Sequence, residues 1–420
     1  VLPWLFATIA ADLNVLPSQT LWIINAYNLA VVMLLLPLSA LAERVGFRRM
    51  FSWGLVLFTL ASLGCALSTS LIQLTVARVL QGVGAASLMC MFGGLVRNIY
   101  PLRMFGRGIS INAMMVALMS VLGPTIGSAI LSFASWPWIF AVNLPIGLLA
   151  MAGLRHLPDV PRSNASLDWI SAVLSMVVLG VFITGIDLMG SALLQGFGLV
   201  AVSAVAAIGL VRRSLAQPAP LVPVDLLKIR PLAFAVVASA CTFAAQMAAY
   251  VTLPFYFEHS FGRLVQDVGI LMAAWPVGTV LMAPVAGRLS DRYSAATLSG
   301  VGALTMALGL AWLIFLPTDA SNARIMVGMV TAGIGFGFFQ TPNNRVLLSS
   351  APRARSGAAG GLQATTRVFG QSFGTALAAI GFSLSASHGS IWGLCFAALC
   401  AVLAIGVNLV RFKAMTPVAQ

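Results

Sequence analysis

A short stretch of the chain occurs twice, as Leu-Ala-Glu-Arg-Val-Gly-Phe-Arg-Arg at residues 41–49 and in altered form as Gly-Arg-Leu-Ser-Asp-Arg-Tyr at residues 287–293. Each copy places one acid, Glu43 or Asp291, beside arginines between two apolar runs, and the two acids are 248 residues apart. The loops that contain Gly108 and Gly357 repeat at almost the same shift, 249 residues. A long internal repeat of this kind predicts two similar halves.

The composition places these halves in a membrane. Of the 420 residues, 60% are hydrophobic and 8% are charged, and the mean hydropathy is +0.99. Soluble globular proteins have roughly 45–50% apolar and about 25% charged residues. The ten acids and 23 bases are too few for a soluble surface, which argues against a soluble enzyme, a disordered chain and a nucleic-acid binder. We therefore predict a polytopic membrane protein.

Thirteen apolar runs are long enough to cross a bilayer, which takes about 20 residues. They are residues 21–41, 50–68, 71–95, 108–132, 138–155, 169–189, 191–211, 232–257, 266–287, 295–316, 323–347, 357–383 and 390–411. The apolar run from Val1 to Ala11 is too short, so we expect Val1 to lie partway through a truncated first span. The prediction is an all-α protein with fourteen spans.

The repeat shift divides these spans into domains. We expect an N-terminal six-helix bundle at 1–157, two additional helices with a cytoplasmic connector at 158–230, a C-terminal six-helix bundle at 231–411 and a tail at 412–420. With both termini cytoplasmic, 19 of the 23 basic residues fall in inner loops, as the positive-inside rule requires. Two parallel halves of this kind are typical of alternating-access carriers with a substrate site near the midplane.

Several motifs resemble those of a known family. They are the 41–49 loop, Ala77-Arg78-Val79-Leu80-Gln81-Gly82-Val83-Gly84-Ala85, Gly123-Pro124-Thr125-Ile126-Gly127, Trp136 to Pro145, and Gln340 to Arg345. Together they resemble the major facilitator superfamily, specifically its fourteen-helix drug:proton antiporters. Ser39 and Met114 stand where that family usually has glycine, and Glu43 where it usually has aspartate. The resemblance implies a monomeric multidrug efflux protein of the bacterial inner membrane, with protons as coupling ion and no other cofactor.

The resemblance also suggests where coupling and gating take place. The family usually carries an acid in its first span, which by alignment would lie upstream of Val1. Charged residues inside spans are expensive and usually functional. The candidates for proton coupling or gating are Arg78, Gln81, Arg367, Glu43, Arg44, Arg48, Asp291 and Arg292. A purely structural clamp on span-end carbonyls remains an alternative for Arg78 and Arg367, and an ordinary solvated carboxylate for Glu43 and Asp291.

The antiporter motif consists of Gly123, Pro124 and Gly127. A proline in a helix removes one backbone hydrogen bond, and glycine lets helices approach closely. In the family this kink is taken to shape the outer half of the cavity. The alternative is a proline that the span merely tolerates.

Polar, aromatic and methionine side chains on the spans expected to face a cavity are candidates for cargo binding. They are Trp22, Asn25, Tyr27, Asn28, Asn112, Met115, Met119, Gln246, Tyr250, Trp275, Phe339, Gln340, Asn343 and Asn344. Such groups suit amphipathic or cationic organic guests through adaptable packing and cation–π contact. Methionines are also common packing residues, so each candidate has a structural alternative.

No catalytic constellation is evident in the sequence. The three histidines lie far apart at loops or span ends, and no metal motif, Walker lysine or CxxC occurs. We therefore expect no enzyme and no metal site. The favoured function is a proton-coupled exporter of small organic compounds that works by alternating access. The alternative is a specialised exporter or importer of a single physiological metabolite.

Overall fold

The computed structural model describes residues 9–415 except 11, 14, 17–18, 159, 161, 163–166, 190–191, 218–219 and 386–387. Helices make up almost all of this part of the chain, and no strand occurs in it. The helices are α2 (Leu21–Val45), α3 (Phe47–Ala66), α4 (Leu71–Met89), α5 (Phe92–Ile99), α6 (Phe105–Phe133), α7 (Pro137–Ala141), α8 (Asn143–Gly153), α9 (Trp169–Met189), α10 (Leu193–Leu215), α11 (Arg230–His259), α12 (Val265–Ser290), α13 (Ala295–Ile314), α14 (Asn322–Ser349), α15 (Ser356–Leu384) and α16 (Gly389–Met415). The all-α prediction is confirmed.

Twelve helical segments in the described ranges are long and apolar enough to cross a membrane. They correspond to all the complete spans expected from the sequence except 357–383. That segment forms α15, a 29-residue helix that is less apolar than the twelve because it is rich in glycine, serine, threonine and glutamine. The expected truncated first span falls largely on residues 1–8, outside the described residues. The count of fourteen spans is therefore not confirmed.

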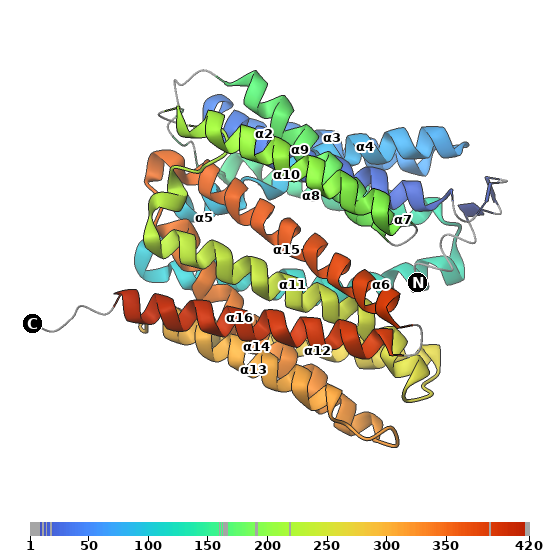
Figure 1. Ribbon diagram of the computed structural model, residues 1–420. Helices are drawn as coiled ribbons and strands as arrows, with labels where there is room; N and C mark the ends of the chain where they lie inside the picture. Colours follow the sequence, from blue (N-terminus) through green and yellow to red (C-terminus); the bar gives the residue numbers. More distant parts are fainter. Residues whose placement is uncertain are drawn as a thin grey trace, which may run out of the picture.

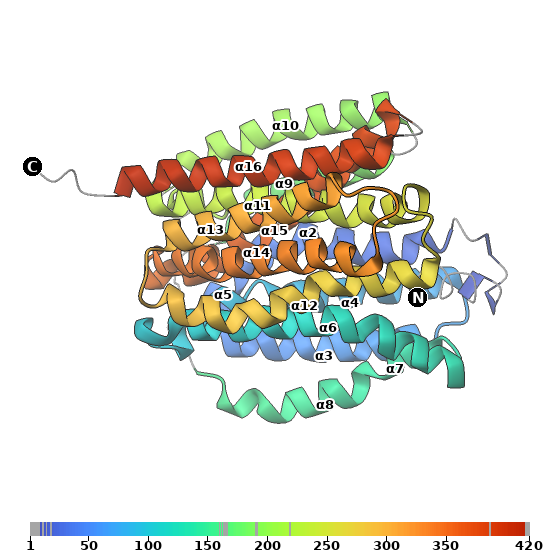
Figure 2. The ribbon, with the colours of Figure 1, turned by 90° about the horizontal axis from the view of Figure 1, so that it is seen from below.

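The helices run roughly along one direction and form two groups (Figure 1). In one group α3 and α2 pack on α4, and in the other α13 and α12 pack on α14 while α11 packs on α16. Two helices cross between the groups: α6 packs mainly on α12, and α15 packs on both α11 and α2. The view turned by 90° shows α6 and α12 side by side and α8 at the edge of the molecule (Figure 2).

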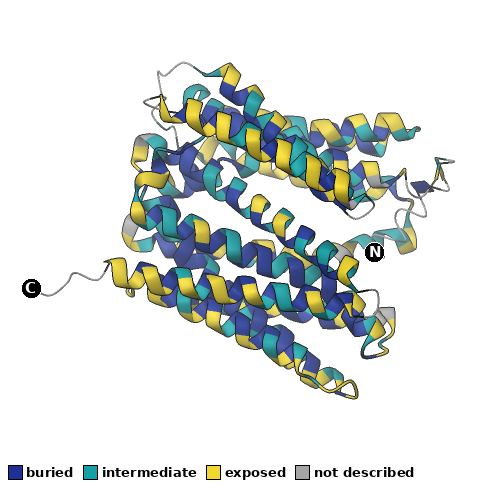
Figure 3. Ribbon diagram, in the orientation of Figure 1, coloured by how far each residue is buried: buried dark blue, intermediate teal, exposed yellow. Residues whose placement is uncertain are grey.

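Buried and exposed residues alternate around the helices (Figure 3), and many of the exposed residues are large and apolar. Leu149 is 76% exposed, Val205 71% and Leu194 87%. Soluble monomers rarely present a surface of this kind, whereas lipid tails accept it without cost. The outward faces are therefore the lipid-facing surface.

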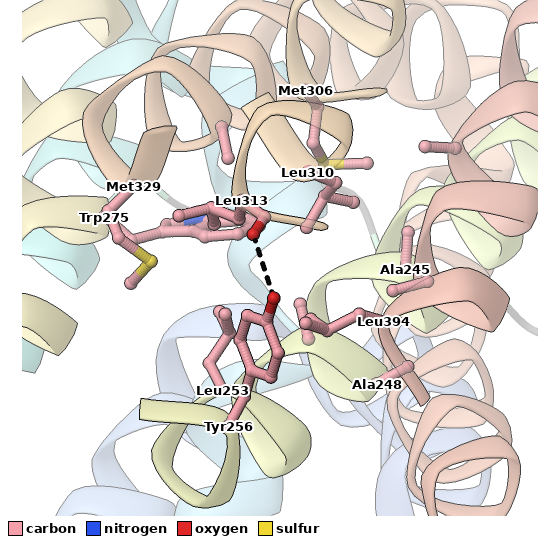
Figure 4. Packing of buried hydrophobic residues seen from close by; sticks show 14 of the residues in the cluster. Ala245, Ala248, Leu253, Tyr256, Trp275, Met306, Leu310, Leu313, Met329 and Leu394 are labelled. Atoms are coloured by element: carbon pink, nitrogen blue, oxygen red, sulfur yellow. Dashed lines mark hydrogen bonds between the residues drawn. The ribbon is translucent and has the colours of Figure 1, made fainter. Parts of the chain in front are cut away.

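The largest buried cluster belongs to the C-terminal group of helices. Trp275, Met306, Leu310 and Leu313 pack in it against α11, where the Tyr256 hydroxyl donates to the Leu313 carbonyl at 3.3 Å (Figure 4). A buried tyrosine hydroxyl needs such a partner because an unpaired one costs free energy. The C-terminal helices thus form a well-packed unit.

Helices approach closely where glycine replaces a larger side chain. A Cβ atom added to Gly84 of α4 would lie 2.7 Å from the Phe58 backbone nitrogen of α3, and one added to Gly335 of α14 would overlap the backbone of Met306. Small residues at helix interfaces permit this contact in membranes.

Basic residues gather at one end of the helix bundle. We call the end formed by Val45, Phe105, Ser290 and Ser356 the basic end and the opposite one the far end. In Figure 1 the basic end is on the left, where α16 leads to the C-terminus.

Candidate functional site

The repeated acid of the N-terminal group fastens the two groups together at the basic end. The Glu43 carboxylate of α2 accepts a hydrogen bond from the backbone amide of Ala358 at 2.7 Å, in the first turn of α15. Free amides at a helix N-terminus carry partial positive charge, so a carboxylate binds there favourably. A Cβ atom at Gly357 would lie 2.5 Å from Cγ of Glu43, so this approach requires glycine.

The repeated acid of the C-terminal group makes the reciprocal contact. Oδ1 of Asp291 accepts a hydrogen bond from the backbone amide of Gly106 at 3.1 Å, in the first turn of α6. It also forms an ion pair with Arg345 of α14 at 3.5 Å. We call the Glu43–Ala358 and Asp291–Gly106 contacts the two latches. Each joins an acid of one half to a helix start in the other half.

The arginines beside these acids have other surroundings. Arg44 donates to the carbonyl of Ala40, in its own helix, at 2.5 Å. Arg48 lines a surface hollow with Arg49 and Arg162, and Arg292 is exposed. Each latch hydrogen bond joins a carboxylate to a backbone amide, and Asp291 in addition forms the inter-helix ion pair with Arg345.

Three adjoining cavities of about 460, 240 and 340 Å³ lie between the two groups of helices. Arg367 of α15 lines all three, and we call them together the central cavity. Its walls come from α2, α3, α4, α5, α6, α9, α11, α12, α14 and α15. Cavities of this size suit small organic molecules.

Many of the expected cargo residues line the central cavity. They are Asn25, Tyr27, Asn28, Asn112, Gln246, Tyr250, Gln340 and Asn344. The cavity also includes residues that the sequence did not single out, among them Met89, Asp187, Met247, Gln363 and Gln371. Gln371 follows Arg367 by one helical turn on α15. This spacing places the two residues on one face of the helix and could have identified Gln371 as a lining residue.

Other expected cargo residues lie elsewhere. Phe339 is 1% exposed and packs in a separate core with Ala303 and Ala404. Trp275 is fully buried behind Tyr250, with ring centroids 5.2 Å apart. These two side chains do not line the central cavity in this structure, and an apolar helix gives no sign in the sequence of which face turns inward.

Three more candidates are also absent from the lining of the central cavity. Trp22 is 61% exposed near the far end of α2, and Met115 and Met119 are 41% and 54% exposed on α6. These three side chains are exposed without being among the described lining residues.

Asn343 is also absent from the lining of the central cavity and is hydrogen-bonded to a buried arginine. Its side-chain oxygen accepts from Arg411 at 3.0 Å, and its amide donates to the carbonyl of Ala235 at 2.8 Å and to Ser239 at 3.1 Å. Arg411 is fully buried. Asn343 thus joins α11, α14 and α16 through its side-chain hydrogen bonds.

Arg78 braces three helices beside the central cavity. Its Nε donates to the carbonyl of Ile23 at 3.1 Å and its Nη1 to Oε1 of Gln81 at 2.5 Å. Gln81 in turn donates to Ser62 of α3 at 2.7 Å. The guanidinium lies 4.1 Å from the ring centroid of Tyr27, which lines the cavity. Arg78 is therefore hydrogen-bonded to a backbone carbonyl and also contacts a residue that lines the central cavity.

The antiporter motif lies in an unbroken helix, since α6 runs from Phe105 to Phe133. A Cβ atom at Gly123 would meet no atom within 4 Å, so no helix packs on this face. The side chain of Pro124 lies outside the described residues, and Gly127 is partly buried. The motif makes no close helix contact at Gly123 in this conformation.

The additional helix α9 forms part of the cavity wall. Ile183 and Asp187 line the same cavity as Arg367, and Phe182 stacks on Phe369 of α15 with ring centroids 5.2 Å apart. The sequence placed this helix between the two bundles without a role in the site. Nothing in its hydropathy separates a cavity-lining helix from a peripheral one.

No group of three or more histidine, cysteine or acidic residues that could hold a metal ion occurs in the described part of the chain. The five cysteines are free thiols.

Comparison with known proteins adds to this geometry. The sequence pattern of the Major Facilitator Superfamily matches residues 1–375 and 235–418. The chain is 44% identical over 411 residues to the uncharacterized transporter YebQ of Escherichia coli K12, covering 96% of this chain and 90% of that protein. It is 30% identical over 384 residues to the riboflavin transporter RibZ of Clostridioides difficile, covering 91% and 84%. It is 28% identical to the tetracenomycin C resistance and export protein of Streptomyces glaucescens, covering 88% and 70%.

Solved structures share the fold. The human organic anion transporter MFSD10 superimposes with a TM-score of 0.67 at 15% sequence identity, covering 94% of this chain and 84% of that one. The proton:xylose symporter XylE superimposes with a TM-score of 0.64 at 16% identity, covering 97% and 90%.

Proposed function

Because the chain belongs to the Major Facilitator Superfamily, we propose that it is a proton-coupled exporter of small amphipathic organic compounds that works by alternating access. The observation that carries this proposal is the central cavity between two halves that the latches join at one end. A carrier of this kind must release the latches to open the basic end. The transporter class follows from the family, whose members are not enzymes.

The latches suit a reversible gate. Each is a charge-assisted hydrogen bond between a carboxylate and a helix N-terminus, worth roughly 1–3 kcal/mol. Two such contacts are strong enough to favour one state and weak enough to be broken by cargo or proton binding. The reciprocal arrangement of Glu43 and Asp291 would let both latches open in one rocking motion.

The coupling ion in this proposal is the proton. Arg78 lies beside Tyr27 at the edge of the central cavity, and Arg367 shares one part of that cavity with Asp187, whose protonation would change the charge near Arg367. One proton moving through about 150 mV releases roughly 3.5 kcal/mol. A tenfold cargo gradient costs about 1.4 kcal/mol, so one proton per neutral cargo could sustain a gradient of a few hundredfold.

The distribution of basic residues indicates how the protein is oriented in its membrane. Basic residues at Arg48, Arg49, Arg103 and Arg353 belong to the basic end, which we place in the cytoplasm by the positive-inside rule. We propose a monomer in the bacterial inner membrane with both termini cytoplasmic. We also propose fourteen spans, with α15 as one of them, because α15 lies between α2 and α11 inside the bundle.

A second candidate is a carrier of one physiological metabolite. It is favoured by the 30% identity to a riboflavin transporter over most of both chains. A competition profile separates the two candidates, since one tight competitor among many compounds indicates a specialist and several weak competitors indicate a multidrug exporter.

Transport into proteoliposomes with an imposed pH gradient tests the proposal. The full-length protein is expected to accumulate a fluorescent organic dye against its gradient when the pH gradient is imposed, and to stop when an ionophore removes it. Accumulation that does not depend on the pH gradient would contradict proton coupling. Exchange of dye without net accumulation would still indicate a carrier.

A further inference from the structure

The charge inside the central cavity points to the kind of cargo. Arg367 lies about 16 Å along α15 from its start at Ser356. It lines all three parts of the cavity and is the one cation among their described lining residues. No ion pair joins it to an acid in the described part of the chain. A guanidinium in such a site lacks the partner that a charge at this depth favours.

The single carboxylate in the described lining is at the edge of this space. Asp187 lies near the far end of α9 and lines one of the three parts, whereas Arg367 lines every part. The guanidinium of Arg367 is therefore the charged group that all three cavities share. A cationic guest in this space would be repelled by the guanidinium, because like charges repel strongly where little water screens them.

Neutral polar and aromatic groups surround Arg367. Gln340 and Gln371 share two of the three cavities with it and supply amides that bind acceptor groups. Phe243 and Phe336 line the wall of one cavity with their rings edge to face at 5.5 Å. This combination fits a flat aromatic body that carries an acidic group, because a guanidinium binds a carboxylate or a similar anion in two-point fashion.

We propose that Arg367 binds an anionic group of the cargo, and that the preferred cargo is an aromatic organic anion. This inference rests on the proposed transport function and narrows its substrate class. It replaces the cationic guests expected from the sequence, an expectation based on methionines and aromatic side chains without regard to Arg367.

Equilibrium binding of two related dyes to the full-length protein in lipid nanodiscs tests the proposal without any gradient. Fluorescein is an anionic xanthene at pH 8, and rhodamine 123 is a cationic one. We expect fluorescein to bind more tightly by about tenfold or more. Arg367→Gln is expected to remove this preference, and Arg367→Lys to keep most of it because the positive charge remains.

Two further variants keep the test independent of any folding defect in Arg367→Gln. Gln340→Glu places a negative charge in the two cavities that Gln340 shares with Arg367, so it should weaken fluorescein binding and improve rhodamine 123 binding. Gln371→Leu removes one amide without changing the charge of the cavity, so it should weaken fluorescein binding less than Gln340→Glu does and should not improve rhodamine 123 binding.

The outcomes separate this inference from the proposed function. Equal or tighter binding of rhodamine 123 to the unmodified protein would overturn the inference, as would an equal loss of both dyes in Arg367→Gln and Gln340→Glu, or no binding of fluorescein. If fluorescein binds with the expected charge preference but is not accumulated under a pH gradient, the inference stands and proton-coupled export fails. If a pH gradient drives accumulation of rhodamine 123 alone, export stands and the inference fails.

Discussion

The carboxylate of Glu43 lies 2.7 Å from the backbone nitrogen of Ala358, a residue 315 positions later in the chain. The second acid of the repeat, Asp291, lies 3.1 Å from the backbone nitrogen of Gly106. Each half thus supplies an acid to a helix start in the other half. Both contacts join a carboxylate to the amide of a helix start, so loss of either charge should loosen its own helix start.

Loss of the Glu43 charge should loosen the basic end. We expect Glu43→Gln to weaken the contact with Ala358 by about 1 kcal/mol, because the amide side chain keeps an acceptor but loses the charge that the helix terminus favours. This corresponds to roughly fivefold faster hydrogen exchange of the backbone amides at the start of α15. Hydrogen-exchange mass spectrometry of the peptide covering residues 353–362 measures it.

Asp291→Asn is the matched variant for the other latch. It should speed exchange at residues 104–110 by a similar factor, since Asp291 binds the amide of Gly106 there. Unchanged exchange at both helix starts would show that the carboxylate charges do not hold the basic end closed.

A side chain at Gly357 should separate the halves by steric contact. An alanine Cβ would lie 2.5 Å from Cγ of Glu43 and 2.9 Å from its Oε1, so we expect Gly357→Ala to open the first latch more than Glu43→Gln does. Hydrogen exchange of the backbone amides at the start of α15 measures this opening. Gly123→Ala is the control, because its Cβ would meet no atom within 4 Å, and it should leave that exchange unchanged.

Asn343 should matter for stability and not for cargo binding. Asn343→Ala removes the partner of the fully buried Arg411 together with two hydrogen bonds to α11. We expect a loss of roughly 3 kcal/mol, because a buried guanidinium is left without its acceptor. Thermal unfolding in detergent measures it, with the partly exposed Thr305→Ala as control. A melting temperature equal to that of the unmodified protein would contradict the structural role.

Acid should weaken the contact between α9 and α10. Asp168, just before α9, accepts hydrogen bonds from Ser171, Arg213 and Gln217. Partial burial raises the pKa of its carboxyl, but these hydrogen bonds outweigh that effect and hold the pKa well below the ordinary value of 3.8. The stabilisation is therefore present above pH 3.8 and is lost as the pH falls from there toward the lowered folded pKa.

Asp168→Asn tests this acid dependence. The variant should be less stable than the unmodified protein at pH 7, and the difference in thermal unfolding should shrink as the pH falls below about 4. A difference that stays constant from pH 7 to pH 3 would show that the charge of Asp168 contributes nothing.

Arg78 should affect coupling and packing together. We expect Arg78→Ala to reduce uptake driven by a pH gradient by about tenfold or more, because it removes the bonds to Ile23 and Gln81 and the cation beside Tyr27. Gradient-free exchange of the same dye separates the roles. If exchange falls as much as uptake, Arg78 is a structural clamp, and if exchange is retained, it belongs to the coupling step. Normal uptake would remove it from both.

The sequence alone determined the membrane class, the helical spans and the duplicated acids. Hydropathy and a repeat shift are properties of the chain itself, so Glu43 and Asp291 could be paired without coordinates. The polar positions of α2 that line the cavity, such as Asn25 and Asn28, were also predictable, because polar groups in a span usually avoid lipid.

Only the tertiary structure decided which faces of the apolar helices turn inward. Trp275, Phe339 and Asn343 pack in the interior of the C-terminal half, whereas Arg367 and Asp187 meet in one cavity. It also decided that backbone amides at helix starts donate to both acids, in addition to the ion pair of Asp291 with Arg345. The physical reason is that lipid and protein core are equally apolar, so hydropathy does not orient a helix, and a helix start offers its amides whatever side chains stand nearby.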